Sequence, residues 1–105
     1  MTPEAKVKAA VKKVLGDYER WGYVWSNWPV PGGFVRPTLD CIAAIQGLAF
    51  AIETKAPGAK PTARQDLEID CLREAGVAVF VIDGDTSELE RWLEHVVSFS
   101  DPASP

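Results

Sequence analysis

Hydrophobic positions follow two different periods along this chain, and each period predicts a different kind of element. Near the N-terminus, apolar residues recur every three or four positions, the spacing that puts them on one face of a helix. This pattern predicts a helix over residues 3–18, capped by Thr2 and with Pro3 in its first turn. Gly16 is expected to weaken this helix or end it early. The apolar stripe consists of Val7, Val11, Val14, Leu15 and Tyr18.

Three strand candidates follow this helix. The aromatic segment 21–28 is the first, residues 39–45 are the second and residues 48–55 are the third. Gln46 and Gly47 separate the last two, which is the length of a tight turn, so these two strands should pair as a hairpin. The loop before the second strand contains Pro29, Pro31, Gly32 and Gly33.

The second half of the chain contains two further helices and one strand. Thr62 is expected to cap a helix that runs to about Glu74 and ends at Gly76. The continuous apolar run at 77–82 predicts a buried central strand. A last helix, capped at residue 86 or 87, is predicted to reach residue 97.

These elements predict one domain of the α/β class over residues 1–97, followed by a disordered tail at 98–105. The order is helix, three strands, helix, strand and C-terminal helix. A hairpin followed by a helix and another strand predicts a small mixed sheet flanked by helices.

Composition is consistent with this picture. The chain has 105 residues, of which 47% are hydrophobic and 25% are charged, as expected for one compact domain. It has no apolar run long enough to span a bilayer and no signal-peptide core, so we expect a cytoplasmic protein. Cys41 and Cys71 lie far apart in apolar stretches, which predicts two buried free thiols.

Charge is distributed unevenly along the chain. The net charge is −4, but residues 1–64 hold nine Lys or Arg against five Asp or Glu. Residues 65–105 hold two against ten. A basic face beside an acidic one is compatible with phosphate binding, although ordinary solvated helix faces would give the same pattern.

Two acidic residues and a lysine are predicted to meet at one end of the hairpin. Side chains alternate across a strand, so Glu53 and Lys55 share a face. On those two residues alone, an exposed strand end with a casual ion pair remains the simpler interpretation. The turn at 46–47, however, folds Asp40 back to about the level of Glu53. Two adjacent carboxylates repel unless a cation joins them, and hard oxygen ligands suit Mg²⁺ or Mn²⁺.

The same residues resemble those of a known nuclease family. Asp40 is followed thirteen positions later by Glu53-Thr54-Lys55, and Gln65 comes ten positions after that. This arrangement resembles the PD-(D/E)XK nuclease superfamily, and within it the VRR-NUC (virus-type replication-repair nuclease) domain. The resemblance covers about half of the chain, in LDCIAAIQGLAFAIETKAPG (39–58), TARQ (62–65) and AGVAVFVI (75–82). One departure is that family members usually have proline directly before the acid, whereas Pro37 lies three positions before Asp40.

The resemblance implies a restriction-endonuclease-like core and a role for each matching residue. Asp40 and Glu53 would ligate the divalent metal, with the backbone carbonyl of Thr54 as a third ligand. Lys55 would orient or activate the attacking water and offset charge on the phosphate. Gln65 would lie close to the site and fix Lys55 or the phosphate, since the helical spacing of Gln65, Ile69 and Leu72 turns it towards the packed side of its helix.

Two of these positions also have simpler interpretations. Gln65 is equally consistent with a first-turn residue that faces solvent. Glu4 falls on the inward stripe of the first helix, and in the resembled family an acid from that helix joins the metal site. It also suits the helix dipole as an ordinary N-terminal acid.

Other residues are candidates for contacts with DNA phosphates, although each alone is equally a solvated charge. These candidates are Lys6, Lys12, Lys13, Lys60 and Arg64. Trp21, Trp25 and Trp28 are candidates for base stacking or a dimer interface, with burial in the core as the commoner fate. We assign no function to His95.

The resemblance implies a Mg²⁺-dependent DNA endonuclease selective for branched DNA, similar to Holliday-junction resolvases. Two symmetric cuts need two active sites, so we expect a homodimer. A nuclease of the same fold acting on flaps, nicks or linear ends, and a non-catalytic nucleic-acid-binding module, are the alternatives.

Overall fold

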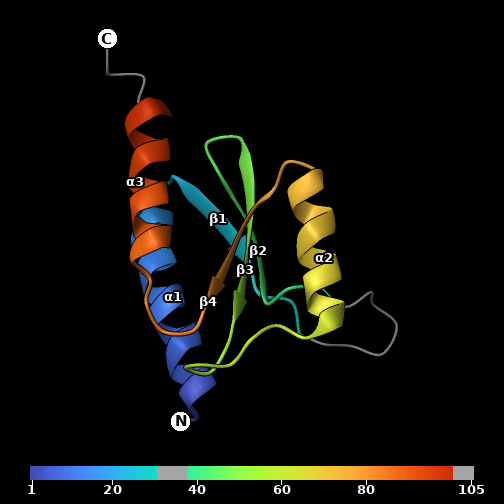
Figure 1. Ribbon diagram of the computed structural model, residues 1–105. Coiled ribbons are helices and arrows are strands. Elements are labelled where there is room, and N and C mark those ends of the chain that lie inside the picture. The colour runs from blue at the N-terminus through green and yellow to red at the C-terminus, as the bar shows by residue number, and fades with distance from the viewer. Residues whose placement is uncertain (31–37, 101–105) are drawn as a thin grey trace.

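A four-stranded mixed sheet lies at the centre of the molecule, with helices on both of its faces (Figure 1). The structure is a computed structural model, and it describes residues 1–30 and 38–100. The elements are α1 (Pro3–Arg20), β1 (Val24–Asn27), β2 (Cys41–Ile45), β3 (Leu48–Thr54), α2 (Ala63–Glu74), β4 (Ala78–Ile82) and α3 (Ser87–Ser100). This order confirms the predicted α/β fold.

The strands lie in the order β1-β2-β3-β4. β1, β2 and β3 are antiparallel neighbours, whereas β4 runs parallel to β3. The prediction of a central strand at 77–82 was therefore wrong, because β4 is an edge strand of the described sheet. β4 is nevertheless apolar because it is covered from both sides: Val79 packs towards α2 and Phe80 towards α3.

The β2–β3 hairpin has the predicted two-residue turn. Gln46 has φ 48° and Gly47 has φ 85°, which are the two left-handed conformations of a type I′ turn. The turn fixes a register in which Cys41 pairs with Ile52. The next positions outwards, Asp40 and Glu53, are therefore neighbours across the two strands.

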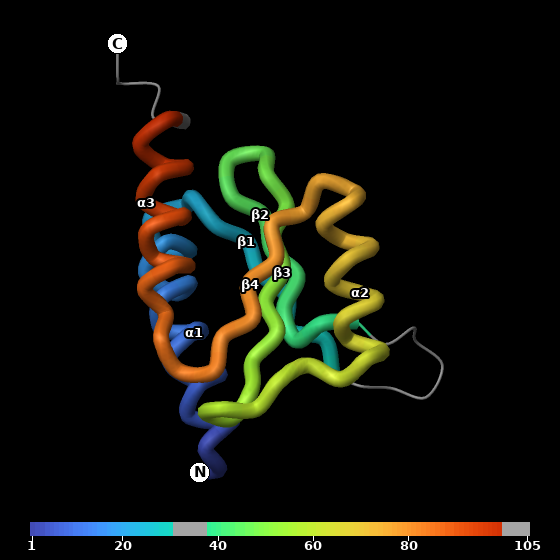
Figure 2. Tube along the Cα trace, viewed as in Figure 1, coloured from blue at the N-terminus to red at the C-terminus, as the bar shows by residue number. Residues whose placement is uncertain are grey.

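Two buried clusters lie on opposite faces of the sheet. The larger one joins α1 and α3 to the sheet, and the smaller one joins α2 to it (Figure 1). The larger cluster contains Val7, Val11, Leu15, Val24, Cys41, Ala43, Ile45, Phe50, Ile52, Phe80, Ile82, Leu89, Leu93 and Val96. The smaller contains Leu39, Ala51, Ile69 and Val79. The start of β2, the end of β3 and the start of α2 all lie at the same end of the molecule (Figure 2).

Helix α1 continues past the glycine that was expected to end it. Gly16 lies inside the helix, next to the fully packed Leu15. Packing of the apolar stripe offsets the cost of an internal glycine, which is about 1 kcal/mol. The helix ends instead at Arg20, where Gly22, two residues further on, has a φ of 81° that allows a closing pair of hydrogen bonds. In this pair Gly22 N–H donates to Glu19 and Tyr23 N–H donates to Tyr18.

Some expectations about single residues were also wrong. Cys41 is buried, and burial raises the pKa of its thiol to about 12, but Cys71 is exposed. Trp21 and Trp25 are each 63% exposed, so neither is buried in the core as was expected of most tryptophans. Trp25 is exposed because β1 is an edge strand and α2 does not cover one of its faces.

Helix α3 runs through Ser100, so residues 98–100 are helical and do not belong to a disordered tail. Residues 101–105 lie outside the described part, as do Pro31, Gly32, Gly33 and Pro37. Among the described helices, none is long and apolar enough to cross a membrane.

The larger core should dominate stability. Leu93 is fully buried, so Leu93→Ala should reduce the free energy of unfolding by about 2–5 kcal/mol. Leu67 is 67% exposed on α2, and the same substitution there should cost about 0.5 kcal/mol or less. Urea denaturation measures both values, and similar losses at the two positions would contradict this assignment of the core.

Candidate active site

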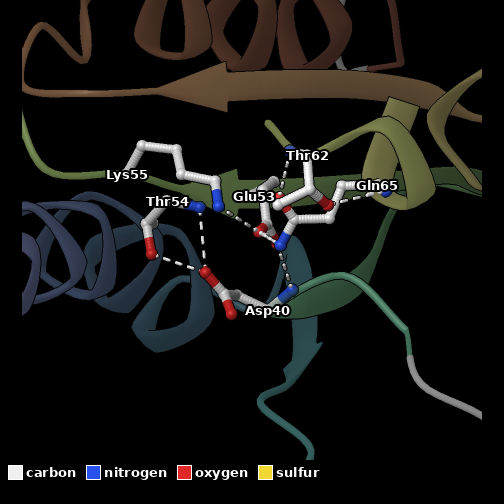
Figure 3. A network of polar contacts seen from close by, with 6 residues as sticks. All are labelled: Asp40, Glu53, Thr54, Lys55, Thr62 and Gln65. Atoms are coloured by element: carbon white, nitrogen blue, oxygen red, sulfur yellow. Dashed lines mark hydrogen bonds and ion pairs between the residues drawn. The ribbon is translucent and has the colours of Figure 1, made fainter. Parts of the chain in front are cut away.

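Five residues from three segments form one polar network at the end of the hairpin, here called the acidic network: Asp40, Glu53, Thr54, Lys55 and Gln65 (Figure 3). Asp40 comes just before β2, and Gln65 lies in the first turn of α2. Glu53 and Thr54 are the last two residues of β3, and Lys55 follows them. The structure therefore brings together the four residues that were predicted to be catalytic.

The Asp40 carboxylate is held against the end of β3 by Thr54. Its Oδ2 accepts a hydrogen bond of 2.9 Å from the Thr54 backbone N–H and one of 2.6 Å from the Thr54 hydroxyl. Its Oδ1 makes no hydrogen bond with the residues drawn in Figure 3. Asp40 thus has one anchored oxygen and one oxygen that the network leaves available.

Glu53 is the most deeply buried charged group that the structure describes, with only 3% of its surface exposed. Its Oε1 accepts a hydrogen bond of 3.1 Å from the Asp40 backbone N–H. Its Oε2 accepts one of 2.6 Å from the Gln65 side-chain amide and lies 3.6 Å from the Lys55 ammonium. Both oxygens therefore have partners, as a buried carboxylate requires.

Burial raises the pKa of Glu53 above its usual value, and the negative charge of Asp40 raises it further. The hydrogen bond from the Asp40 backbone and the nearby Lys55 ammonium act in the opposite direction, but they do not cancel the first two effects. The pair of carboxylates thus carries more negative charge than its single ammonium balances. This imbalance is the electrostatic condition under which a bound cation is favourable.

Gln65 uses both ends of its side-chain amide. Its Oε1 accepts a hydrogen bond of 2.9 Å from the Thr62 backbone N–H, and the Gln65 backbone N–H donates to the Thr62 hydroxyl at 3.2 Å. These two bonds form a capping box at the start of α2. The remaining amide group, Nε2, is then turned towards Glu53. Of the two interpretations of Gln65, the structure supports the one that places it at the site.

The network contains the kind of donors that Mg²⁺ or Mn²⁺ requires, namely carboxylate oxygens from two adjacent residues. Asp40 Oδ1 and an oxygen of Glu53 are the atoms that would hold such an ion. Within residues 1–30 and 38–100, however, no three His, Cys, Asp or Glu side chains form a group that could hold a metal. A third protein ligand would therefore be an oxygen of another kind, and the Thr54 backbone carbonyl remains the predicted one.

The structure does not bring Glu4 to the network. Glu4 is exposed in the first turn of α1, the helix on the face of the sheet opposite α2, and the described residues contain no three-carboxylate group. Glu4 was a candidate because it falls on the inward stripe of this helix. The buried residues of that stripe begin only at Val7, one turn further along. Glu4 is therefore an N-terminal acid that favours the helix dipole.

The predicted DNA-contacting residues fall into two groups. Lys60 and Arg64 are exposed just before and within the first turn of α2, near the acidic network. Lys6, Lys12 and Lys13 are exposed on α1, across the sheet from α2 (Figure 1). The Lys12 ammonium lies 5.0 Å from the centre of the Trp28 ring, a cation–π contact.

Two contributions were missed from the sequence. Strand alternation puts the Thr54 side chain on the opposite face of β3 from Glu53. Its hydroxyl nevertheless donates to Asp40, because Asp40 lies just outside β2 and is not bound by the alternation of that strand. The signal for Thr62 was present in the sequence, since Thr62-x-x-Gln65 is a capping-box pattern. That pattern was used only to place the helix start, although it also orients the Gln65 amide.

Comparison of this chain with protein-family models, with curated proteins and with solved structures finds no match.

The Thr54 hydroxyl should stabilise the fold through Asp40. Thr54→Val keeps the shape but removes a hydrogen bond to a charged group, so the free energy of unfolding should fall by about 1–2 kcal/mol. In an Asp40→Ala background the same substitution should cost less, because its partner is already gone. A double-mutant cycle by urea denaturation measures this coupling, and additive losses would show that the two side chains do not interact.

The raised pKa of Glu53 should make stability depend on pH when no divalent cation is present. The folded state holds the Glu53 proton more tightly than the unfolded chain does, so the free energy of unfolding should fall as pH rises above the usual value of 4.5. The fall should end above the raised pKa. Glu53→Gln cannot titrate, so the wild type should lose stability relative to this variant over that window. Parallel pH profiles for the two proteins would contradict the shift.

Proposed function

We propose that this protein is a Mg²⁺- or Mn²⁺-dependent DNA endonuclease that hydrolyses phosphodiester bonds in branched DNA. The observation that supports the proposal most is the convergence of Asp40, Glu53 and Lys55 at one end of the hairpin, with Glu53 buried. Placing a buried carboxylate next to a second carboxylate beside a single lysine costs stability unless the pair binds something. A divalent cation and a phosphate are ligands that suit this charge pattern.

Each residue has a role that follows from its contacts. Asp40 and Glu53 would hold the metal, which when bound would polarise the phosphate and lower the pKa of a water molecule. Thr54 fixes the orientation of Asp40 through two hydrogen bonds, so this ligand is already positioned in the empty protein. Gln65 fixes the orientation of Glu53 in the same way, through the hydrogen bond that it donates to Oε2. Such advance positioning is what makes charge stabilisation effective in a transition state.

Lys55 would neutralise charge on the scissile phosphate and orient the attacking water. Its backbone N–H donates to Ile82 of the neighbouring β4 at 2.9 Å, which fixes the start of the side chain. Its side chain is mostly buried, with 14% exposed, and its ammonium lies 3.6 Å from Glu53. A lysine held this way can approach a phosphate bound at the two carboxylates without a change in the backbone.

One observation favours the non-catalytic alternative. Both oxygens of Glu53 and one oxygen of Asp40 already have partners within the protein, so the network is also consistent with a structural role. In that case the chain would be a binding module that cuts nothing. Because the two functions differ in their need for metal, a metal-dependent cleavage assay separates them.

The form of the substrate and the assembly belong to the same proposal. One chain supplies one such site, so symmetric cleavage of a four-way junction would require a homodimer. Flaps, nicks and linear ends need only one site and remain the alternative substrates.

Cleavage should require the acidic network and a divalent cation. With Mg²⁺ or Mn²⁺, the wild type should cut at least one DNA in a panel of duplex, flap and four-way junction, and chelation should stop it. Lys55→Ala and Asp40→Asn should each lower the cleavage rate by about 100-fold or more, as expected for loss of a group that stabilises transition-state charge.

Arg91→Ala is the matched control, because it removes one positive charge from an exposed position of α3, the helix on the face of the sheet opposite α2. This variant should cleave at close to the wild-type rate. Calorimetric titration with Mn²⁺ should show binding to the wild type and weaker binding to Asp40→Asn. Wild-type cleavage rates in both network variants would overturn the proposal, and metal-independent DNA binding without cleavage would favour the binding module.

A further inference from the structure

A pocket of about 380 Å³ opens beside the acidic network. It lies between the side of α2 and the two residues that precede Asp40, Thr38 and Leu39. Gln65 lines this pocket and also donates to Glu53, so one side chain belongs to both. A group bound in the pocket would therefore lie directly next to whatever the carboxylates hold.

The pocket combines apolar walls with polar groups at a few places. Leu39, which is 2% exposed, Leu67 and Cys71 supply the apolar surface. The hydroxyls of Thr38 and Thr62, the amide of Gln65, the guanidinium of Arg64 and the carboxylate of Glu68 supply hydrogen-bonding groups. Its lining is thus divided about evenly between apolar and polar groups, and a mixed pocket of a few hundred Å³ suits a small organic group that is apolar on its faces and polar at its edge.

A nucleobase has matching chemistry. Its two faces are apolar, and its edge carries both hydrogen-bond donors and acceptors, which match hydroxyl, amide and guanidinium groups around the pocket. Arg64 adds a positive charge to the lining, which can pair with a phosphate of the same DNA strand. None of the residues lining the pocket within the described chain is aromatic, so a base would be enclosed by aliphatic side chains and would not stack on a ring.

We propose that this pocket binds one unpaired nucleobase of the DNA strand whose phosphate lies at the acidic network. The identity of the ligand rests on the proposed function. A base within intact duplex is paired and stacked, and removing it costs free energy that an unpaired base does not have to supply. The pocket thus provides a physical reason for selecting branched or single-stranded positions over uninterrupted duplex.

The test uses 2-aminopurine, a base whose fluorescence is quenched by stacking. Flap oligonucleotides carrying it at successive positions near the branch are titrated with the protein in chelator, so that cleavage plays no part. At the position that enters the pocket, fluorescence should rise by on the order of twofold or more, because the base loses its stacked neighbours and gains no aromatic one. An oligonucleotide with the same label in intact duplex should show no rise.

A pocket-filling substitution supplies the matched comparison. Cys71 is exposed and lines the pocket, so Cys71→Trp should fill it without contacting the acidic network. This variant should lose the fluorescence rise and bind flap DNA about tenfold more weakly, as expected when one base contact is lost. Asp70→Trp puts the same ring at the neighbouring exposed position of α2, outside the pocket, and should behave like the wild type. Circular dichroism and urea denaturation confirm that both variants fold.

The outcomes separate this inference from the proposed function. A fluorescence rise that Cys71→Trp abolishes supports the pocket, even if no DNA is ever cut. Lys55-dependent cleavage with no rise at any labelled position overturns the pocket and leaves the nuclease proposal standing. A rise that persists unchanged in Cys71→Trp also overturns it. Absence of any DNA binding by anisotropy overturns both.

Discussion

The register of the β2–β3 hairpin is the constraint on which the rest of the site depends. Gln46 and Gly47 both take left-handed conformations, and this two-residue turn allows only one alignment of the strands. In that alignment Asp40 follows the Cys41–Ile52 pair and so lies beside Glu53. A slip of one residue would move every side chain of one strand to the opposite face. It would expose Phe50 and Ile52, which are fully buried, and would separate the two carboxylates. Burial of the core and assembly of the site therefore select the same register.

The second constraint is the buried charge of Glu53, which the fold has to satisfy from within. Two of its partners come from the hairpin, the Asp40 backbone and Lys55, and the third is Gln65 of α2. Because Gln65 also closes the capping box with Thr62, the start of α2 and the position of Glu53 are set by one side chain. Loss of Gln65 would leave both a helix end and a buried carboxylate short of a partner. The site is thus connected to secondary structure on both sides, which keeps its residues in place without a ligand.

Local features of the sequence were enough to predict most of this arrangement. The turn at 46–47 and strand alternation placed Asp40, Glu53 and Lys55 together, and the helical spacing of Gln65 placed it against them. The errors arose where a distant contact decides the outcome. Gly16 stays helical because Leu15 packs into the core, and β4 is an apolar edge strand because two helices cover it. Thr54 was missed because alternation describes side chains within paired strands, and Asp40 lies just beyond the end of one. The proposal of nuclease activity is based on the resemblance of the sequence pattern together with this geometry.

Lys55 is the member of the network that can change partners at the lowest cost. Asp40 is tied by two hydrogen bonds to Thr54, and moving Gln65 would uncap α2. The Lys55 ammonium, by contrast, lies 3.6 Å from Glu53, longer than an ordinary hydrogen bond, at the end of a flexible side chain. The attraction that keeps this ammonium beside Glu53 is therefore electrostatic and depends on the charge of that carboxylate. We infer that the Glu53–Lys55 pair stabilises the network within the protein itself. Asp40 and Glu53 would hold a metal, whose charge would offset theirs, and Lys55 would be the residue able to pair with the phosphate, as its proposed role requires.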